Sequence, residues 1–146
     1  YQPYIVEKIT SADGKIIFKQ KPVVRKKIRN QNKFLEKVRS FLKETVNGPK
    51  GTGKKAKSDL FIISGKTGTA QAAKLAVTGT KKNSEETKRS TRDHSWFIAF
   101  APYKNPEIAL VIFAEHSGLH GSYFAPMAKE IIEFYIKGKR GISIDE

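Results

Sequence analysis

The stretch Ile63–Gln71, with the sequence Ile-Ser-Gly-Lys-Thr-Gly-Thr-Ala-Gln, constrains the fold more than any other part of the chain. The apolar run Leu60–Ile63 leads into it, and an apolar run bounded by polar residues is typical of a buried strand. Gly65 and Gly68 then interrupt the pattern. Because glycine weakens the interior of a strand, two glycines indicate a place where a ligand or another backbone comes close.

Three polar side chains give this strand its chemistry. Thr67 and Thr69 are two residues apart, so their hydroxyls point to one face of the strand. Lys66 supplies a cation beside them, although strict alternation places it on the opposite face. Its long side chain must therefore fold over the strand edge to join the threonines. Together these groups suit an anion, such as a substrate carboxylate, that lies along the strand.

The segment Ser64–Gln71 resembles the lysine-threonine-glycine motif of penicillin-binding proteins and serine β-lactamases. Downstream, His94–Pro102 and Ala109–His116 look like the next two strands of that domain, and Ala125–Ile132 looks like its closing helix. The resemblance covers nearly the whole chain. It is to the C-terminal part of the transpeptidase domain of a class B penicillin-binding protein, of the penicillin-binding protein 2 type that acts in cell elongation.

This resemblance implies that the chain is part of a peptidoglycan D,D-transpeptidase. In such an enzyme a serine attacks a D-alanine carbonyl of a stem peptide, the acyl group passes to an amine of a neighbouring strand, and β-lactams acylate the same serine. Lys66 and Thr69 are the expected catalytic residues: Lys66 tunes proton transfer of the serine, and the Thr69 backbone N–H is an oxyanion donor. The expected substrate-binding residues are Thr67, Gly68, Thr69, Ala70 and Gln71.

The nucleophile that this mechanism needs is not evident in the sequence. The helix-borne serine motif and the serine-x-asparagine motif of the family are both absent. Ser40 and Lys43 match Ser-x-x-Lys, but Ser40 lies mid-helix on the side away from Val38, and the family's serine lies far upstream of the motif strand. We therefore expect residues 1–146 to be the C-terminal portion of one transpeptidase domain and to be inactive alone. The nucleophile-bearing part is expected upstream, on the same protein or on a separate chain.

The net charge of +14 leaves other functions open, and most of the excess lies in residues 15–57. A basic segment indicates an anionic partner, such as nucleic acid, a membrane face or a lipid-linked pyrophosphate, or else a solvated surface. A basic nucleic-acid-binding module is thus one alternative. The aromatic residues on two-sided apolar strands are better explained as core, so nucleic acid is not an expected partner. A catalytically inactive structural domain is the other alternative.

Two further patterns are typical of ligand sites, namely a histidine pair and a glycine-rich loop. The chain has no cysteine, and glycines around His116 and His120 predict a loop there, so neither a metal site nor a cofactor is expected. Gly48–Lys55 nearly matches a phosphate-binding loop, but Lys55 replaces the required hydroxyl and the loop follows a helix. It resembles instead the glycine-threonine-glycine connector of penicillin-binding proteins.

The remaining pattern predicts an α+β fold, the C-terminal half of the penicillin-binding protein transpeptidase and β-lactamase-like fold, with an antiparallel sheet flanked by helices. Strands are predicted at 94–101 and 108–114, each apolar on both faces and the first covered on both sides. A hairpin is predicted around Ala12–Gly14. A helix is predicted over 32–46, and another over 122–137 that Ser122 caps and Gly138 ends. The expected apolar stripes are Phe34, Leu35, Val38, Phe41, Leu42 and Val46 on the first helix, and Phe124, Met127, Ala128, Ile131, Ile132 and Tyr135 on the second.

Residues 72–92 are expected to form a flexible loop beside the cleft. The sequence contains no apolar run long enough to cross a membrane and no signal peptide. The resemblance implies an anchor on the missing N-terminal part and a location on the periplasmic face of the inner membrane. The implied partners are the stem peptide, β-lactams, the missing N-terminal part and scaffold proteins of the elongation complex.

Overall fold

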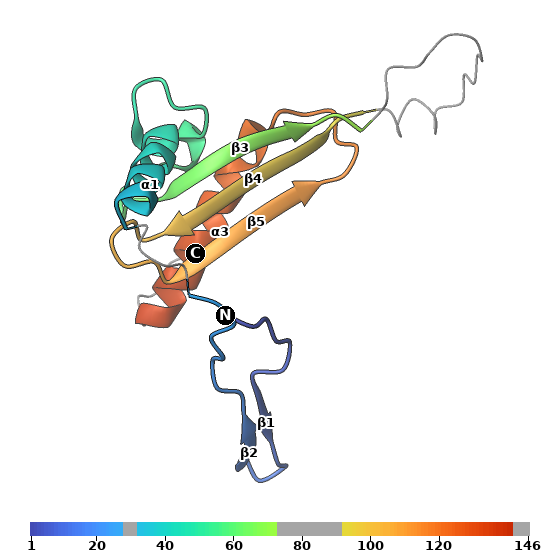
Figure 1. Ribbon diagram of the computed structural model, residues 1–146. Coiled ribbons are helices and arrows are strands. Elements are labelled where there is room, and N and C mark those ends of the chain that lie inside the picture. The colour runs from blue at the N-terminus through green and yellow to red at the C-terminus, as the bar shows by residue number, and fades with distance from the viewer. Residues whose placement is uncertain (28–31, 73–91, 142–146) are drawn as a thin grey trace, which may run out of the picture. The chain divides into compact units, whose positions relative to one another are not determined.

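The computed structural model describes residues 1–27, 32–72 and 92–141 (Figure 1). The chain divides into two compact units, Tyr1–Phe34 and Leu35–Glu146. None of the helices within these described ranges is both long and apolar enough to cross a membrane. The loop predicted over 72–92 falls outside the described residues except at its two ends.

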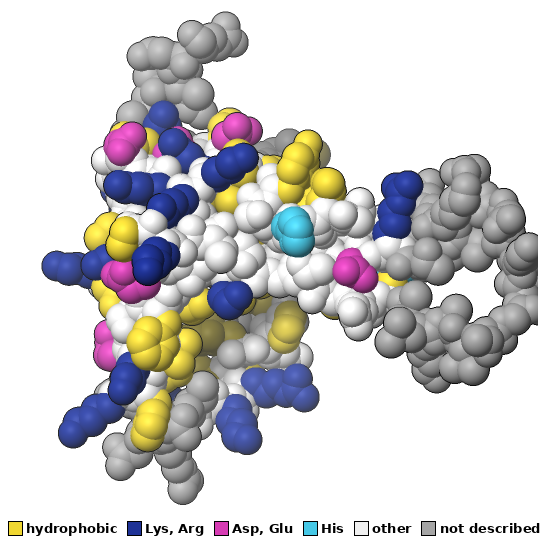
Figure 2. All heavy atoms as spheres, turned by 90° about the horizontal axis from the view of Figure 1, so that it is seen from above, with side chains coloured by type: hydrophobic (Ala, Val, Ile, Leu, Met, Phe, Trp, Pro, Cys, Tyr) yellow, Lys and Arg dark blue, Asp and Glu magenta, His cyan; other side chains and the backbone are white. Residues whose placement is uncertain are grey.

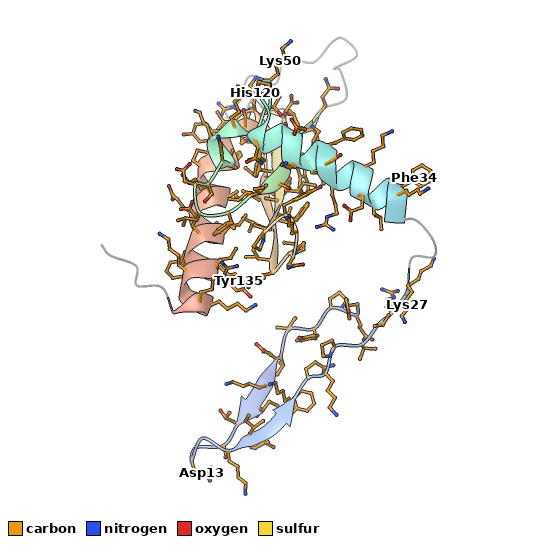
Figure 3. All side chains as sticks on the ribbon, turned by 90° about the vertical axis from the view of Figure 1, so that its left-hand side faces the viewer. Asp13, Lys27, Phe34, Lys50, His120 and Tyr135 are labelled. Carbon is orange, nitrogen blue, oxygen red and sulfur yellow. The ribbon has the colours of Figure 1, made fainter. Side chains whose placement is uncertain are left out.

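The first unit contains the predicted hairpin, in which β1 (Lys8–Thr10) pairs antiparallel with β2 (Ile16–Lys19). Gly14 has φ +81°, a conformation that glycine adopts without strain. The Ser11 hydroxyl donates to the carboxylate of Asp13, which lies at the hairpin tip (Figure 3). This bond lowers the pKa of Asp13 below its ordinary value. The hairpin prediction is therefore confirmed, with short strands.

The second unit is built on a three-stranded antiparallel sheet in the order β3 (Ser64–Ala70), β4 (His94–Ala101) and β5 (Ile108–Ala114). The register places Thr67 opposite Phe97. A short turn joins β4 to β5, which confirms the two predicted downstream strands and their antiparallel pairing. Figure 1 shows the three strands side by side with β3 at one edge.

The helices lie on opposite faces of this sheet (Figure 3). Helix α3 (Ala125–Arg140) follows the short helix η2 (Gly121–Phe124) and packs on one face. Helix α1 (Asn32–Asn47) lies on the other face, where the Arg39 guanidinium is 5.8 Å from the centre of the Phe100 ring. The fully or almost fully buried apolar core comprises Val46, Ala56, Ile63, Phe97, Ala99, Ala101, Ala125, Ala128, Ile132 and Ile136.

The strand predicted at Leu60–Ile63 is not present, because β3 begins only at Ser64. Leu60 and Ile62 are 57% and 39% exposed, whereas Ile63 is fully buried. The carbonyls of this segment bond to groups other than a neighbouring strand: Ile62 accepts from Tyr103 N at 3.0 Å, and Ile63 accepts from the Asn47 side chain at 2.8 Å. The apolar run is thus a connection that packs on the core through Ile63 and the half-buried Phe61.

The prediction that β4 is covered on both faces is wrong for the described chain. Its inward residues are buried, but Trp96 and Ile98 on the other face are 37% and 42% exposed. On β5, Val111 and Phe113 of the same face are 59% and 47% exposed. Most of the predicted α1 stripe is also exposed, namely Phe34, Leu35, Val38 and Phe41. One apolar face of the sheet is therefore covered only in part.

The closing helix differs from its prediction at both ends. Ser122 lies in η2 and does not cap α3, which begins at Ala125 without a side-chain cap. Gly138 lies inside the helix, and Gly141, with φ +65°, is the residue that ends it. The last turn is held by Glu107, whose carboxylate accepts from Lys139 at 3.2 Å and Arg140 at 2.8 Å. Of the predicted stripe, Met127, Ile131 and Tyr135 are exposed.

Candidate active-site strand

The predicted site residues lie on β3, whose outer edge pairs with no other strand in the described part of the chain. Lys66 is exposed, and Thr67 and Gly68 are half-buried. Thr69 and Ala70 are exposed at the end of the strand, and Gln71 lies just beyond it. The structure therefore brings the predicted residues together on one open edge.

Lys66 and the two threonines lie on opposite faces, as alternation requires. Lys66 is opposite Ile98 in the register, and Thr67 is opposite the buried Phe97. The Lys66 ammonium nevertheless donates to the Thr67 carbonyl oxygen at 2.8 Å. Its side chain thus folds back over the strand, which brings the cation to the same stretch of backbone as the threonines.

Thr67 and Thr69 open into a polar pocket of about 240 Å³. The Thr67 hydroxyl is 3.0 Å from the hydroxyl of Thr52, which comes from the Gly-Thr-Gly connector. The far wall comes from the loop that leads into α3, so three separate segments of the chain meet here. The pocket is lined by Thr52, Thr67, Gly68, Thr69, His120, Gly121 and Ser122.

The connector is fixed to the end of α1. The Gly53 N–H donates to the Thr45 carbonyl at 2.9 Å. A Cβ atom on Gly51 would lie 2.2 Å from the same Thr45 oxygen, so only glycine fits there. The backbone on both sides of Thr52 is therefore held against the helix. As predicted, the segment follows a helix; it leads through the short helix η1 (Lys54–Ala56) toward β3.

The loop after β5 is fixed beneath the motif strand. Ser95, which is fully buried and opposite Thr69, has its hydroxyl 2.6 Å from that of Ser117 and donates to the Leu119 carbonyl. A Cβ atom on Gly121 would lie 2.2 Å from the Trp96 oxygen. These contacts set the position of His120, which Figure 3 shows at one end of this unit.

His116 pairs with a different histidine from His120, the one that its spacing in the sequence suggested. His116 and His120 lie in a loop, as predicted, and His116 has φ +48°. The partner of His116 is His94, whose Nδ1 accepts from the His116 backbone N–H at 2.9 Å. Within the described ranges, no group of three or more His, Cys, Asp and Glu side chains is placed to hold a metal ion.

Ser40 is engaged within α1 rather than at the pocket. Its hydroxyl donates to the Lys37 carbonyl at 2.8 Å, one turn earlier in the same helix. The pocket residues that sequence reasoning missed are Thr52, His120 and Ser122. Only the Gly-Thr-Gly spacing in front of the motif gave a signal for Thr52, since glycines on both sides of a threonine indicate a close backbone approach.

An antiparallel sheet between two helices, with a Lys-Thr-Gly-Thr edge strand, is the arrangement expected of the penicillin-binding protein transpeptidase and β-lactamase-like fold. The model of the penicillin-binding protein transpeptidase domain family matches residues 1–133. The chain belongs to this family.

Its curated relatives are named peptidoglycan D,D-transpeptidases. The peptidoglycan D,D-transpeptidase MrdA of Haemophilus influenzae is 35% identical over 102 residues, which is 69% of this chain and 16% of that protein. The structure of a complex between PBP2 and MreC from Helicobacter pylori matches with a TM-score of 0.62, at 26% identity over 85% of this chain and 21% of that one. The imipenem acyl-enzyme complex of Mycobacterium tuberculosis penicillin-binding protein A matches with a TM-score of 0.60, at 26% identity over 92% of this chain and 26% of that one. The chain therefore spans about one sixth of the curated relative that it matches.

Proposed function

We propose that this chain forms the substrate-binding wall of a peptidoglycan D,D-transpeptidase that works through a serine acyl-enzyme. The observation that carries the proposal is the open β3 edge, where Lys66, Thr67 and Thr69 meet beside a polar pocket. The relative MrdA is named for this activity, and the imipenem complex shows that a protein with this fold forms an acyl-enzyme.

The side chains and the backbone of β3 have different roles in the proposed reaction. The hydroxyls of Thr67 and Thr69 donate to the carboxylate of the stem peptide or of a β-lactam, and the Lys66 ammonium adds a positive charge. Backbone groups alternate in direction along a strand, so the Thr69 N–H points the same way as the Thr67 carbonyl that Lys66 reaches. The Thr69 N–H is thereby placed as an oxyanion donor, and loss of such a donor slows acyl transfer about 10²–10³-fold.

The nucleophile comes from a part of the domain that this chain does not span. Trp96, Ile98, Val111 and Phe113 form an exposed apolar sheet face, and the α1 stripe is exposed as well. Contiguous exposed apolar surface marks an interaction site. The remaining part of the domain, on the same protein or on a separate chain, covers this face and brings its serine to the β3 edge.

The partners and the location follow from the same proposal. The complete protein acts on stem peptides, is acylated by β-lactams, and works with a scaffold protein, as the complex of PBP2 with MreC suggests. Peptidoglycan is assembled outside the cytoplasmic membrane, so we place the site on the periplasmic face of that membrane, held by a segment outside this chain.

The nucleic-acid alternative receives less support. On the face drawn in Figure 2, Lys and Arg side chains are scattered, with Asp and Glu between them, rather than gathered in one basic stripe. A nucleic-acid site needs a continuous basic track along the backbone of its ligand. The family match favours a transpeptidase, so the alternative that remains is a member of this family without catalytic activity.

Labelling by a fluorescent penicillin tests the proposal. The complete protein should be labelled on a serine outside residues 1–146, and the isolated chain should not be labelled. Lys66→Met in the complete protein should strongly reduce labelling, whereas the matched change Lys37→Met on exposed α1 should not. A complete protein that no penicillin labels would show an inactive family member, and labelling of the isolated chain at Ser40 would contradict the assignment of the nucleophile.

A further inference from the structure

We propose that Thr52 is a positioning residue for this reaction, which holds the Thr67 hydroxyl so that its proton points at the substrate carboxylate. The inference rests on the proposed function and assigns a role to a residue outside the Lys-Thr-Gly motif. It begins from the distance of 3.0 Å between the two threonine hydroxyls, which come from segments on either side of η1.

Proton counting makes the direction of this hydrogen bond matter. Each hydroxyl has one proton to donate and two lone pairs that accept. If Thr67 donates to Thr52, it has no proton left for an incoming carboxylate. If Thr52 donates to Thr67, the Thr67 proton is free for the anion. An anion in the pocket therefore selects the second arrangement, in which Thr52, Thr67 and the carboxylate form one chain of hydrogen bonds.

Such a chain strengthens its last member. A hydroxyl that accepts a hydrogen bond becomes a better donor, and this cooperative effect amounts to roughly 10–30% per bond. Both hydroxyls are open to water in this structure, so water competes for them while the pocket is empty. A bound substrate displaces that water, and the contact with Thr52 then matters most.

The position of Thr52 is set by its neighbours rather than by its own side chain. The Gly53 N–H is bonded to the Thr45 carbonyl, and the Gly51 backbone lies against the same carbonyl. A Cβ atom on Gly53 would lie 3.2 Å from the ring of Phe97, which is fully buried and opposite Thr67 in the register. A Cβ atom on Gly65 of β3 would also lie 3.2 Å from this ring, so the connector and the motif strand pack on the same buried side chain.

The experiment compares two penicillins on the complete protein. Benzylpenicillin carries the free carboxylate, and its methyl ester has the same reactive ring with the carboxylate masked. The measured quantity is the ratio of the two second-order acylation rates. Any loss of folded protein lowers both rates equally and cancels from this ratio, so a destabilised variant still reports on the hydrogen bond.

Thr52→Val should lower the acid-to-ester ratio about fivefold, the size expected for one neutral hydrogen bond. Thr52→Ser, which retains the hydroxyl, should keep the ratio of the unaltered protein. Thr67→Val should lower the ratio at least as far, and the double variant Thr52→Val with Thr67→Val should be no worse than Thr67→Val alone, because the two hydroxyls act as a unit. Thr10→Val, on the separate hairpin, is the control and should leave the ratio unchanged.

Two results would overturn the inference. An unchanged ratio in Thr52→Val, whether both rates fall or neither does, would show a structural role or none. Additive losses in the double variant would show that Thr52 does not act through Thr67. If neither penicillin acylates the unaltered protein, the proposed function fails and the inference fails with it. If the unaltered protein is acylated and Thr52→Val leaves the acid-to-ester ratio unchanged, only the inference fails.

Discussion

Gly121 is a position at which the structure predicts a large effect from a single added methyl group. A methyl group added there would lie 2.2 Å from the Trp96 carbonyl oxygen and 2.7 Å from that of Gly68. Both atoms belong to paired strand backbone, which cannot move aside, so in Gly121→Ala the loop between β5 and α3 must move outward by about 1 Å. Overpacking of this kind costs about 1–3 kcal/mol of unfolding free energy.

The same shift should slow acylation, because this loop forms one wall of the pocket beside Thr67 and Thr69. A displacement of about 1 Å near a reacting group can cost as much as 10²-fold in rate. Gly138→Ala is the matched control. That glycine lies within α3 and has no atom within 4 Å of the added methyl group. Alanine is the better helix former, so this variant should gain about 0.5–1 kcal/mol.

The two variants are compared by urea unfolding and by penicillin acylation of the complete protein. The structure predicts opposite signs for stability, and a loss of acylation only in Gly121→Ala. Equal stability changes in the two variants would refute the argument, since it assigns opposite effects to the same chemical change. Normal acylation by a destabilised Gly121→Ala would show that the loop does not shape the pocket.

Two further predictions follow from the same structure. Thr69→Val keeps the shape of the side chain but removes a donor to the carboxylate, so acylation should slow roughly tenfold or more, and an unchanged rate would contradict the carboxylate role. The pKa of Glu107 lies below its ordinary value of 4.5 because Arg140 and Lys139 donate to the carboxylate. The ionised group therefore stabilises the fold above pH 4.5, and this contribution is lost as the pH falls through the lowered pKa. Glu107→Gln should lower the melting temperature at neutral pH, and the difference should shrink as the solution is acidified; a difference that is independent of pH would contradict the ion pairs.

Strands could be predicted from the sequence where apolar residues form an uninterrupted run. The apolar runs at 94–101 and 108–114 predicted both strands and their pairing, because a short turn between two apolar runs leaves few other arrangements. The same apolar content misled the prediction of coverage. Sequence shows that Trp96 and Val111 are apolar, but not whether the element that covers them belongs to this chain.

Helix ends were predicted less well, because local propensity competes with tertiary contacts. Asn47–Pro49 ended α1 as predicted, whereas Gly138 did not end α3. The helix continues because Glu107, from the turn before β5, binds the side chains of its last turn. A contact between residues so far apart in the chain cannot be predicted from the sequence pattern around the helix end.

The candidate site was predictable in its motif and not in its surroundings. The Lys66–Gln71 stretch identified the strand and the family, but the pocket also needs Thr52 and Ser122. These residues join it through the packing of the connector and of the loop that enters α3. Their spacing in the sequence contains no periodic signal, so only the structure shows that they share one pocket.

A crystal structure of the complete protein acylated by benzylpenicillin tests the central claim most directly. The account predicts a serine outside residues 1–146 in covalent linkage, with the ligand carboxylate hydrogen-bonded to Thr67 and Thr69. The ester oxygen should accept a hydrogen bond from the Thr69 N–H, and the apolar face around Trp96 should be covered. An acylated Ser40, or a ligand that makes no contact with β3, would contradict the claim.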